Sequence, residues 1–205
     1  MIDYKHKQPF GDRLSIALKK FETPLCVGID PHISLMPEFF KSPNRKQQIE
    51  KIKSFSLSCI DAAQNRVPAI KPQVALFEKF GPEGMEILQQ IGKNAESAGL
   101  LAIMDAKRGD IGNTSKMYAD AFLKNMNFNS ITVNPYMGSD SVKPFLEIDK
   151  KFIIILALTS NNGSRDLQLK SLSGSGNENF IFSEVINASR DWGDESNTMY
   201  VVGGT

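Results

Sequence analysis

The chain has 205 residues, of which 41% are hydrophobic and 23% charged, a composition typical of one globular domain with a single sizeable core. Its formal net charge is +1 and no block of like charge stands out, so the sequence gives no sign of a surface for nucleic acids or acidic membranes. No apolar stretch approaches the roughly 18 to 20 residues of a membrane span, and residues 1–13 lack a signal-peptide core, so we expect a cytoplasmic protein.

Apolar segments rich in β-branched residues alternate with amphipathic segments along the chain. An initial helix is predicted over residues 12–21, followed by a buried strand over 24–30. The next helix begins near Ser42, the predicted N-cap, with Pro43 in its first turn. The later elements are strands at 67–73, 100–106, 130–136, 151–159 and 198–205, separated by helices at 81–99, 113–125, 141–148 and 177–193.

Strands that are separated by helix-length segments indicate parallel βαβ units with right-handed crossovers. Such units form either an open doubly wound sheet or a (β/α)₈ barrel, and periodicity alone does not choose between them. The segment 160–177 is rich in Ser, Asn and Gly, and we predict a mobile loop there.

The two cysteines, Cys26 and Cys59, lie far apart in the sequence. They show neither CxxC spacing nor the clustered histidines of zinc sites. We therefore predict no metal site and no disulfide framework, and we interpret both cysteines as small core residues.

Charged residues end the first three predicted strands. Asp30 ends the first and Lys71 the second, while Asp105 ends the third and Lys107 follows two residues later. In parallel α/β folds, ligands bind at the carboxyl ends of the strands. Because side chains alternate along an extended chain, we expect Asp105 and Lys107 to face one pocket and Arg108 to point away from it.

Each of these charges taken singly could be a solvated residue at the end of a strand. Four together favour a site, because burying an ion costs several kcal/mol unless partners satisfy it. Lys107 stands between Asp105 and Asp110 in the sequence, and neighbouring carboxylates favour the ammonium form. We therefore interpret Lys107 as a proton donor and not as a Schiff-base nucleophile.

Six motifs, CVGIDPH, AIKPQVALFEKFGPEG, DAKRGDIGNT, VNPYMGSDS, LALTSNNGS and VVGGT, follow one another along the chain. With these motifs in this order, the sequence resembles the orotidine 5′-phosphate decarboxylase family, in particular its bacterial subgroup. The resemblance covers essentially the whole chain, and the DxKRGDIGxT block is its most specific element. It implies a (β/α)₈ barrel that converts orotidine 5′-phosphate to UMP and CO₂, the last step of UMP biosynthesis, without metal or organic cofactor.

The resemblance also implies the residues that carry out this chemistry. Lys107 would protonate C6 of the pyrimidine, and Asp105 would lie against the departing carboxylate, with Lys71 in the same charge network. Asp30 matches a ligand of the ribose hydroxyls. Ser160 matches a serine that hydrogen-bonds the pyrimidine ring.

A homodimer is implied as well. Asp110 and Thr114 match residues that reach across the dimer interface into the neighbouring subunit's site. The small-molecule substrate would therefore bind in a site that two subunits share.

The chain departs from the family in its length. A barrel of this class takes about 250 residues and commonly builds its phosphate site from the loops after strands seven and eight. Here we count about six βα units, and the family's phosphate-binding glutamine and arginine have no counterpart. We expect residues 1–205 to form a single barrel domain that is incomplete at the C-terminus.

Two alternatives remain open from the sequence. One is a Mg²⁺-dependent sugar-phosphate decarboxylase or aldolase of the same suprafamily, which shares a DxKxxD block, although the KRGDIGNT continuation and Lys71 favour the orotidylate reaction. The other is a noncatalytic dimerisation module derived from the enzyme. Turnover of orotidine 5′-phosphate in the presence of a chelator separates the three.

Overall fold

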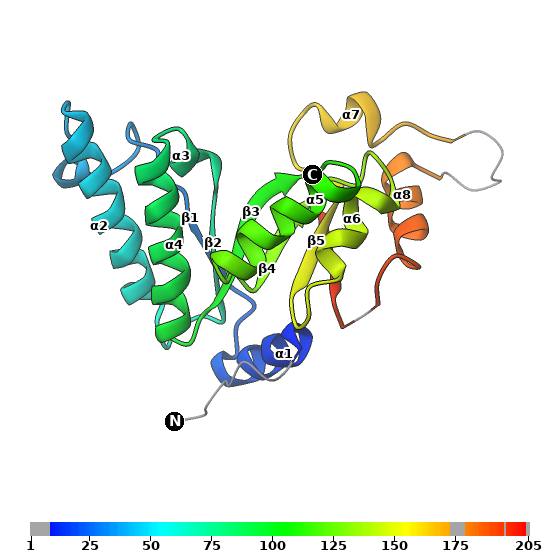
Figure 1. Cartoon of the computed structure of the whole chain (residues 1–205), viewed down its shortest axis with the longest axis horizontal. Helices are drawn as coiled ribbons and strands as arrows, with labels where there is room; N and C mark the ends of the chain where they lie inside the picture. The colour runs from blue at the N-terminus through cyan, green and yellow to red at the C-terminus, as the bar shows by residue number, and fades with distance from the viewer. Residues whose placement is uncertain (1–8, 173–178, 195, 204–205) are drawn as a thin grey trace.

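The structure, a computed structural model, describes residues 9–172, 179–194 and 196–203. Six parallel strands form one sheet and lie side by side in chain order (Figure 1). They are β1 (Cys26–Ile29), β2 (Ala69–Pro72), β3 (Leu101–Arg108), β4 (Ser130–Val133), β5 (Phe152–Leu158) and β6 (Thr198–Val202). Strand order reverses in a doubly wound sheet, whereas successive right-handed crossovers without reversal put all connecting helices on one face and curl the sheet. The fold is therefore of the (β/α) barrel type, represented here by six strands of a curled sheet.

The first helix precedes the strands, and those that follow connect them, with the longer ones covering the outer face of the sheet. The helices are α1 (Phe10–Phe21), α2 (Arg45–Ala63), α3 (Ala75–Glu78), α4 (Pro82–Ser97), α5 (Gly112–Ala119), α6 (Ser139–Leu146), α7 (Ser164–Leu167) and α8 (Ile181–Ser189), with the short turns η1 (Glu38–Phe40) and η2 (Asp120–Asn125). Helix α2 packs on β1 and β2, α4 on β3, and both α6 and α8 on β5. No helix in the described ranges is long and apolar enough to cross a membrane.

Two apolar clusters hold these layers together. The larger one lies between the sheet and the outer helices and includes the fully buried Phe77, Phe128 and Phe145. The smaller one joins α1 to β2, β3 and β5, where the rings of Phe10 and Phe152 lie 4.8 Å apart. Helix α1 thus covers the amino-terminal ends of the strands (Figure 1), and the carboxyl ends are left for a site.

Two helix boundaries test the predictions made from capping residues. The helix predicted over 81–99 is confirmed: α4 begins at Pro82, and Gly99, with φ at +71°, follows its end. The predicted cap of α2 is wrong by two residues: the Asn44 side chain accepts the backbone N–H of Gln47 at 3.2 Å, while the Ser42 hydroxyl accepts that of Asn44. Asn44 therefore takes the role that we had assigned to Ser42.

Three further expectations need correction. The first strand is not buried along its length, since only Ile29 is buried and Cys26 is exposed, because among the described strands β1 pairs with β2 alone. The predicted helix over 113–125 is α-helical only to Ala119 and continues as a π-turn in η2. The predicted loop over 160–177 contains the helix α7, and its part from 173 onward lies outside the described residues.

Candidate active site

Three charged side chains meet at the carboxyl ends of β2 and β3. Asp105 accepts a hydrogen bond from Lys107 Nζ on Oδ1 at 2.6 Å and one from Lys71 Nζ on Oδ2 at 3.0 Å. The Asp105 side chain is 10% exposed, whereas those of Lys71 and Lys107 are 34% and 47% exposed. We call these three residues the charge cluster. Each carboxylate oxygen has its own ammonium partner, so the buried charge is satisfied and the cluster keeps a net positive charge toward solvent.

The two ammonium groups determine the ionisation of Asp105. Burial by itself raises the pKa of this carboxyl group, but hydrogen bonds and charge from Lys107 and Lys71 outweigh burial and hold the pKa below its ordinary value. Asp105 is therefore a carboxylate at neutral pH. It keeps the ammonium of Lys107 in place without removing its proton.

An irregularity in β3 aims Lys107 at Asp105. The sequence placed Asp105 at the end of this strand, but the strand continues to Arg108. Its register with β4 shifts between Met104 and Arg108, and Lys107 has a φ of +47°, a left-handed conformation that is rare outside glycine. The expected contact between Asp105 and Lys107 is present, but simple alternation is the wrong reason for it. A strained residue of this kind is held by its surroundings and clusters at functional sites.

Arg108, the residue after the strained position, makes a different set of contacts. Its guanidinium forms an ion pair with Glu78 at the end of α3. It also lies 5.5 Å from the ring centres of both Tyr118 and Phe122. These contacts agree with the expectation that Arg108 points away from the site, and they tie the end of β3 to the segment that follows β2.

The other four predicted site residues lie at the same edge of the sheet but outside the charge cluster. Asp30 is exposed directly after β1, and Ser160 is exposed shortly after β5. Asp110 binds the backbone N–H of Ile111 at 2.8 Å, and Thr114 is exposed in the first turn of α5. Within the described residues, none of these four side chains forms a hydrogen bond or ion pair with the charge cluster.

Two polar residues near the site were not singled out from the sequence. The buried Thr132 of β4 donates its hydroxyl hydrogen to Asp105 Oδ1 at 3.0 Å. Gln168, just after α7, accepts the backbone N–H of Thr159 at 2.7 Å and so secures the residue next to Ser160. A threonine between the apolar Ile131 and Val133 was a usable signal for the first, whereas the second fell in the segment that we had assigned to a loop.

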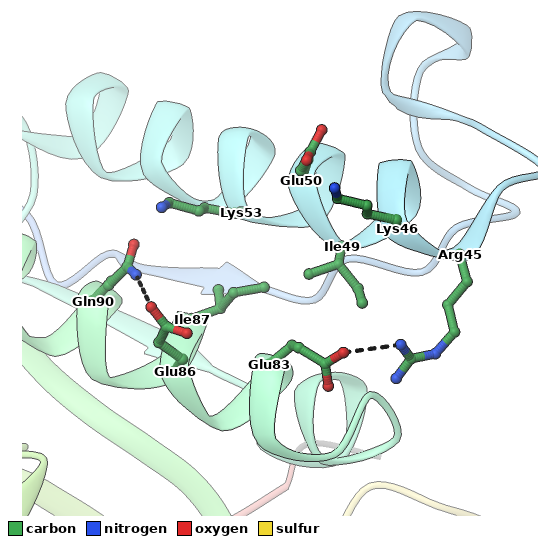
Figure 2. A pocket seen from close by; sticks show the side chains of 9 residues that line it. All are labelled: Arg45, Lys46, Ile49, Glu50, Lys53, Glu83, Glu86, Ile87 and Gln90. Atoms are coloured by element: carbon green, nitrogen blue, oxygen red, sulfur yellow. Dashed lines mark hydrogen bonds and ion pairs between the residues drawn. The ribbon is translucent and has the colours of Figure 1, made fainter.

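A cavity of about 460 Å³ lies elsewhere, between α2 and α4 on the helical layer (Figure 2). Two polar contacts cross its lining: Arg45 pairs with Glu83 at 3.0 Å, and Gln90 donates to Glu86 at 3.2 Å. None of the predicted site residues lines it. The carboxyl ends of the strands remain the candidate site.

Comparison with known proteins identifies the family. The family model described as "Orotidine 5'-phosphate decarboxylase / HUMPS family" matches residues 23–183. The chain belongs to this family.

Individual members of the orotidine 5′-phosphate decarboxylase family agree with this assignment. The chain is 42% identical to an orotidine 5′-phosphate decarboxylase of Christiangramia forsetii over 197 residues, which cover 95% of this chain and 69% of that protein. It is 43% identical to one of Flavobacterium johnsoniae, covering 88% and 64%. The solved structure of Leishmania donovani OMP decarboxylase matches with a TM-score of 0.78 and 34% identity, covering 96% of this chain and 71% of that one. The chain thus spans about two thirds of the length of these family members.

Proposed function

We propose that this family member is a carboxy-lyase of the cytoplasm that decarboxylates orotidine 5′-phosphate to UMP in the last step of UMP biosynthesis. The observation that supports this most is the charge cluster, in which an ammonium group, Lys107, is held at 2.6 Å from a buried carboxylate, Asp105. The relatives that carry this enzyme's name support the substrate.

In the proposed reaction, the bond between C6 and the carboxylate carbon breaks and its electron pair stays on C6. Lys107 Nζ then transfers one proton to C6, becomes a neutral amine and is reprotonated from solvent. Because C6 has no adjacent carbonyl to spread the charge, the site must supply preorganised positive charge, which Lys107 and Lys71 provide. Asp105 holds both lysines and, beside the substrate carboxylate, disfavours the ground state.

The remaining predicted residues would hold the substrate. Asp30 and Ser160 are both exposed after their strands, where they are free to bind the ribose hydroxyls and the pyrimidine ring. Binding energy from such remote groups holds the ring against the charge cluster. This binding energy raises the rate only where it stabilises the transition state more than the bound substrate.

An exposed apolar surface supports the proposed homodimer. Ile111 and Met117 lie after β3, and Tyr136 and Met137 lie after β4; all four are exposed, Tyr136 to 78%. These two segments adjoin, because the Ser115 hydroxyl donates to the carbonyl of Ser141 at 2.7 Å.

A patch of this kind on an α/β protein marks an interface, and a two-fold dimer places the same patch on both subunits. Asp110 and Thr114 lie beside this patch in the sequence. Within such a dimer, they would reach the partner's site.

Turnover of orotidine 5′-phosphate by the purified chain tests the proposal, followed by ultraviolet absorbance with and without EDTA. We expect turnover that EDTA leaves unchanged. Among the described residues, no three His, Cys, Asp or Glu side chains gather as a metal site would require. Activity that chelation abolishes would favour the Mg²⁺-dependent alternative, and dimerisation without turnover would favour a noncatalytic module.

A further inference from the structure

Thr132 stands at the centre of the irregularity in β3. The register pairs Met104 with Ile131 and Arg108 with Val133, so the β3 residues 105–107 face Thr132 alone. A bulge of this kind removes backbone N–H groups from the regular ladder, and buried N–H groups need other partners. The Thr132 side chain supplies them.

The hydroxyl of Thr132 uses its complete hydrogen-bonding capacity at this point. It accepts the backbone N–H of Ala106 at 3.0 Å and that of Lys107 at 2.9 Å. A hydroxyl has two acceptor sites and one donor hydrogen, so with both acceptor sites filled the hydrogen is left for Asp105 Oδ1, 3.0 Å away. One buried side chain therefore fixes both the backbone of Lys107 and the carboxylate that Lys107 binds.

The backbone contact also explains how Lys107 keeps its φ of +47°. A non-glycine residue persists in the left-handed region only where its surroundings specify that conformation. The Lys107 N–H is held by Thr132. The carbonyl of the following residue, Arg108, accepts the N–H of Asn134 at 2.7 Å. Both anchors come from β4 or the residue that follows it, so β4 sets the conformation from which Lys107 reaches its ion pair.

We propose that Thr132 is a positioning residue: its hydroxyl holds Lys107 and Asp105 in the relative geometry that proton delivery to substrate requires. This rests on the proposed function, since the reaction is what the geometry serves. Thr132 does not touch substrate in this proposal and acts only through the two residues that it binds.

Variants of β4 test the proposal. Thr132→Val keeps the shape and removes the hydroxyl, while Thr132→Ser keeps the hydroxyl. Ser130→Ala is the matched control, because Ser130 is a buried residue of the same strand whose hydroxyl has no hydrogen-bond partner in the described structure. If Thr132→Val fails to fold, Thr132→Cys replaces it, since a thiol is a weak donor and acceptor of nearly the same size.

Two measurements are made on each variant: amide hydrogen exchange of Ala106 and Lys107 by NMR, and steady-state kinetics. Thr132→Val should speed exchange at these two amides by about tenfold or more. It should lower kcat by about ten- to a hundredfold, with KM changed less than about twofold. Thr132→Ser should restore both, and Ser130→Ala should change neither.

Unchanged exchange in Thr132→Val overturns the proposal, and so does faster exchange with a normal kcat, which would make Thr132 structural only. A fall in kcat that Thr132→Ser does not rescue also overturns it. If the unmodified chain itself shows no turnover, the proposed function fails. In that case, faster exchange confined to Ala106 and Lys107 still supports Thr132 as the residue that positions them.

Discussion

The carboxyl and amino ends of the strands, here called the carboxyl edge and the amino edge, surround a lysine with opposite charges. At the carboxyl edge, Lys107 is paired at 2.6 Å with a buried carboxylate. At the amino edge, Lys151, just before β5, donates to the side-chain amide oxygen of Asn127 at 2.9 Å and lies near the buried Arg13. Burial, and then the charge of Arg13, lower the pKa of Lys151 to about 8, while Glu96 opposes the shift.

This difference indicates that the carboxyl edge serves the reaction and that the amino edge serves stability. The carboxyl edge concentrates charge around a strained residue, Lys107, that is held by hydrogen bonds to Thr132 and Asp105. The amino edge is closed by α1 and places two cations, Lys151 and Arg13, near each other, with the carboxylate of Glu96 acting on both. In barrels the carboxyl edge carries activity and the amino edge carries stability, so changes at the two edges should have separable effects.

The largest expected effect on activity comes from two variants at the carboxyl edge, each placed in a different subunit of a dimer. Lys107→Ala and Asp110→Ala should each be inactive alone. In mixed dimers, the subunit that keeps Lys107 receives Asp110 from its partner, so one of the two sites is intact. Random mixing should return about a quarter of wild-type activity. Activity that stays at background, although mixed dimers form, would contradict the shared site.

A smaller effect is expected from a glycine that approaches Ser160. A Cβ on Gly203 would lie 2.8 Å from the backbone nitrogen of Ser160, so Gly203→Ala must displace that residue. We expect KM to rise by about tenfold, because Ser160 is a proposed ligand of the pyrimidine. Gly11→Ala on α1 is the control at the amino edge, where the nearest atom is 3.4 Å away, and it should leave KM unchanged. A normal KM in Gly203→Ala would remove Ser160 from the site.

The smallest effect concerns stability at the amino edge. Between pH 8 and 10.5, the folded state holds fewer protons on Lys151 than the unfolded state, so stability should increase with pH in that window. Lys151→Gln should remove this increase, add about 1 kcal/mol to the free energy of unfolding at pH 7, and leave turnover unchanged. Urea unfolding of both proteins at pH 7 and pH 10 measures these differences in the free energy of unfolding. An increase in stability between pH 7 and pH 10 that the variant retains in full would contradict the assignment.

The sequence predicted the strands, the barrel-type alternative and the pairing of Asp105 with Lys107, because hydrophobic periodicity and strand-end charges are local signals. It did not predict the bulge at Lys107, since the register of β3 depends on a hydroxyl 25 residues away in the sequence. The shift of the α2 cap from Ser42 to Asn44 has a similar cause, because both residue types cap helices and the choice depends on which one reaches a free N–H.

The most direct test of the central claim is the turnover of Lys107→Ala. The ammonium of Lys107 is proposed both to stabilise the carbanion and to protonate it, so kcat should fall by at least about a thousandfold. Because Asp105 keeps Lys71 and the Thr132 hydroxyl as hydrogen-bond partners in this variant, the protein should still fold, and urea unfolding checks this. A correctly folded Lys107→Ala protein with a nearly normal kcat would contradict the account.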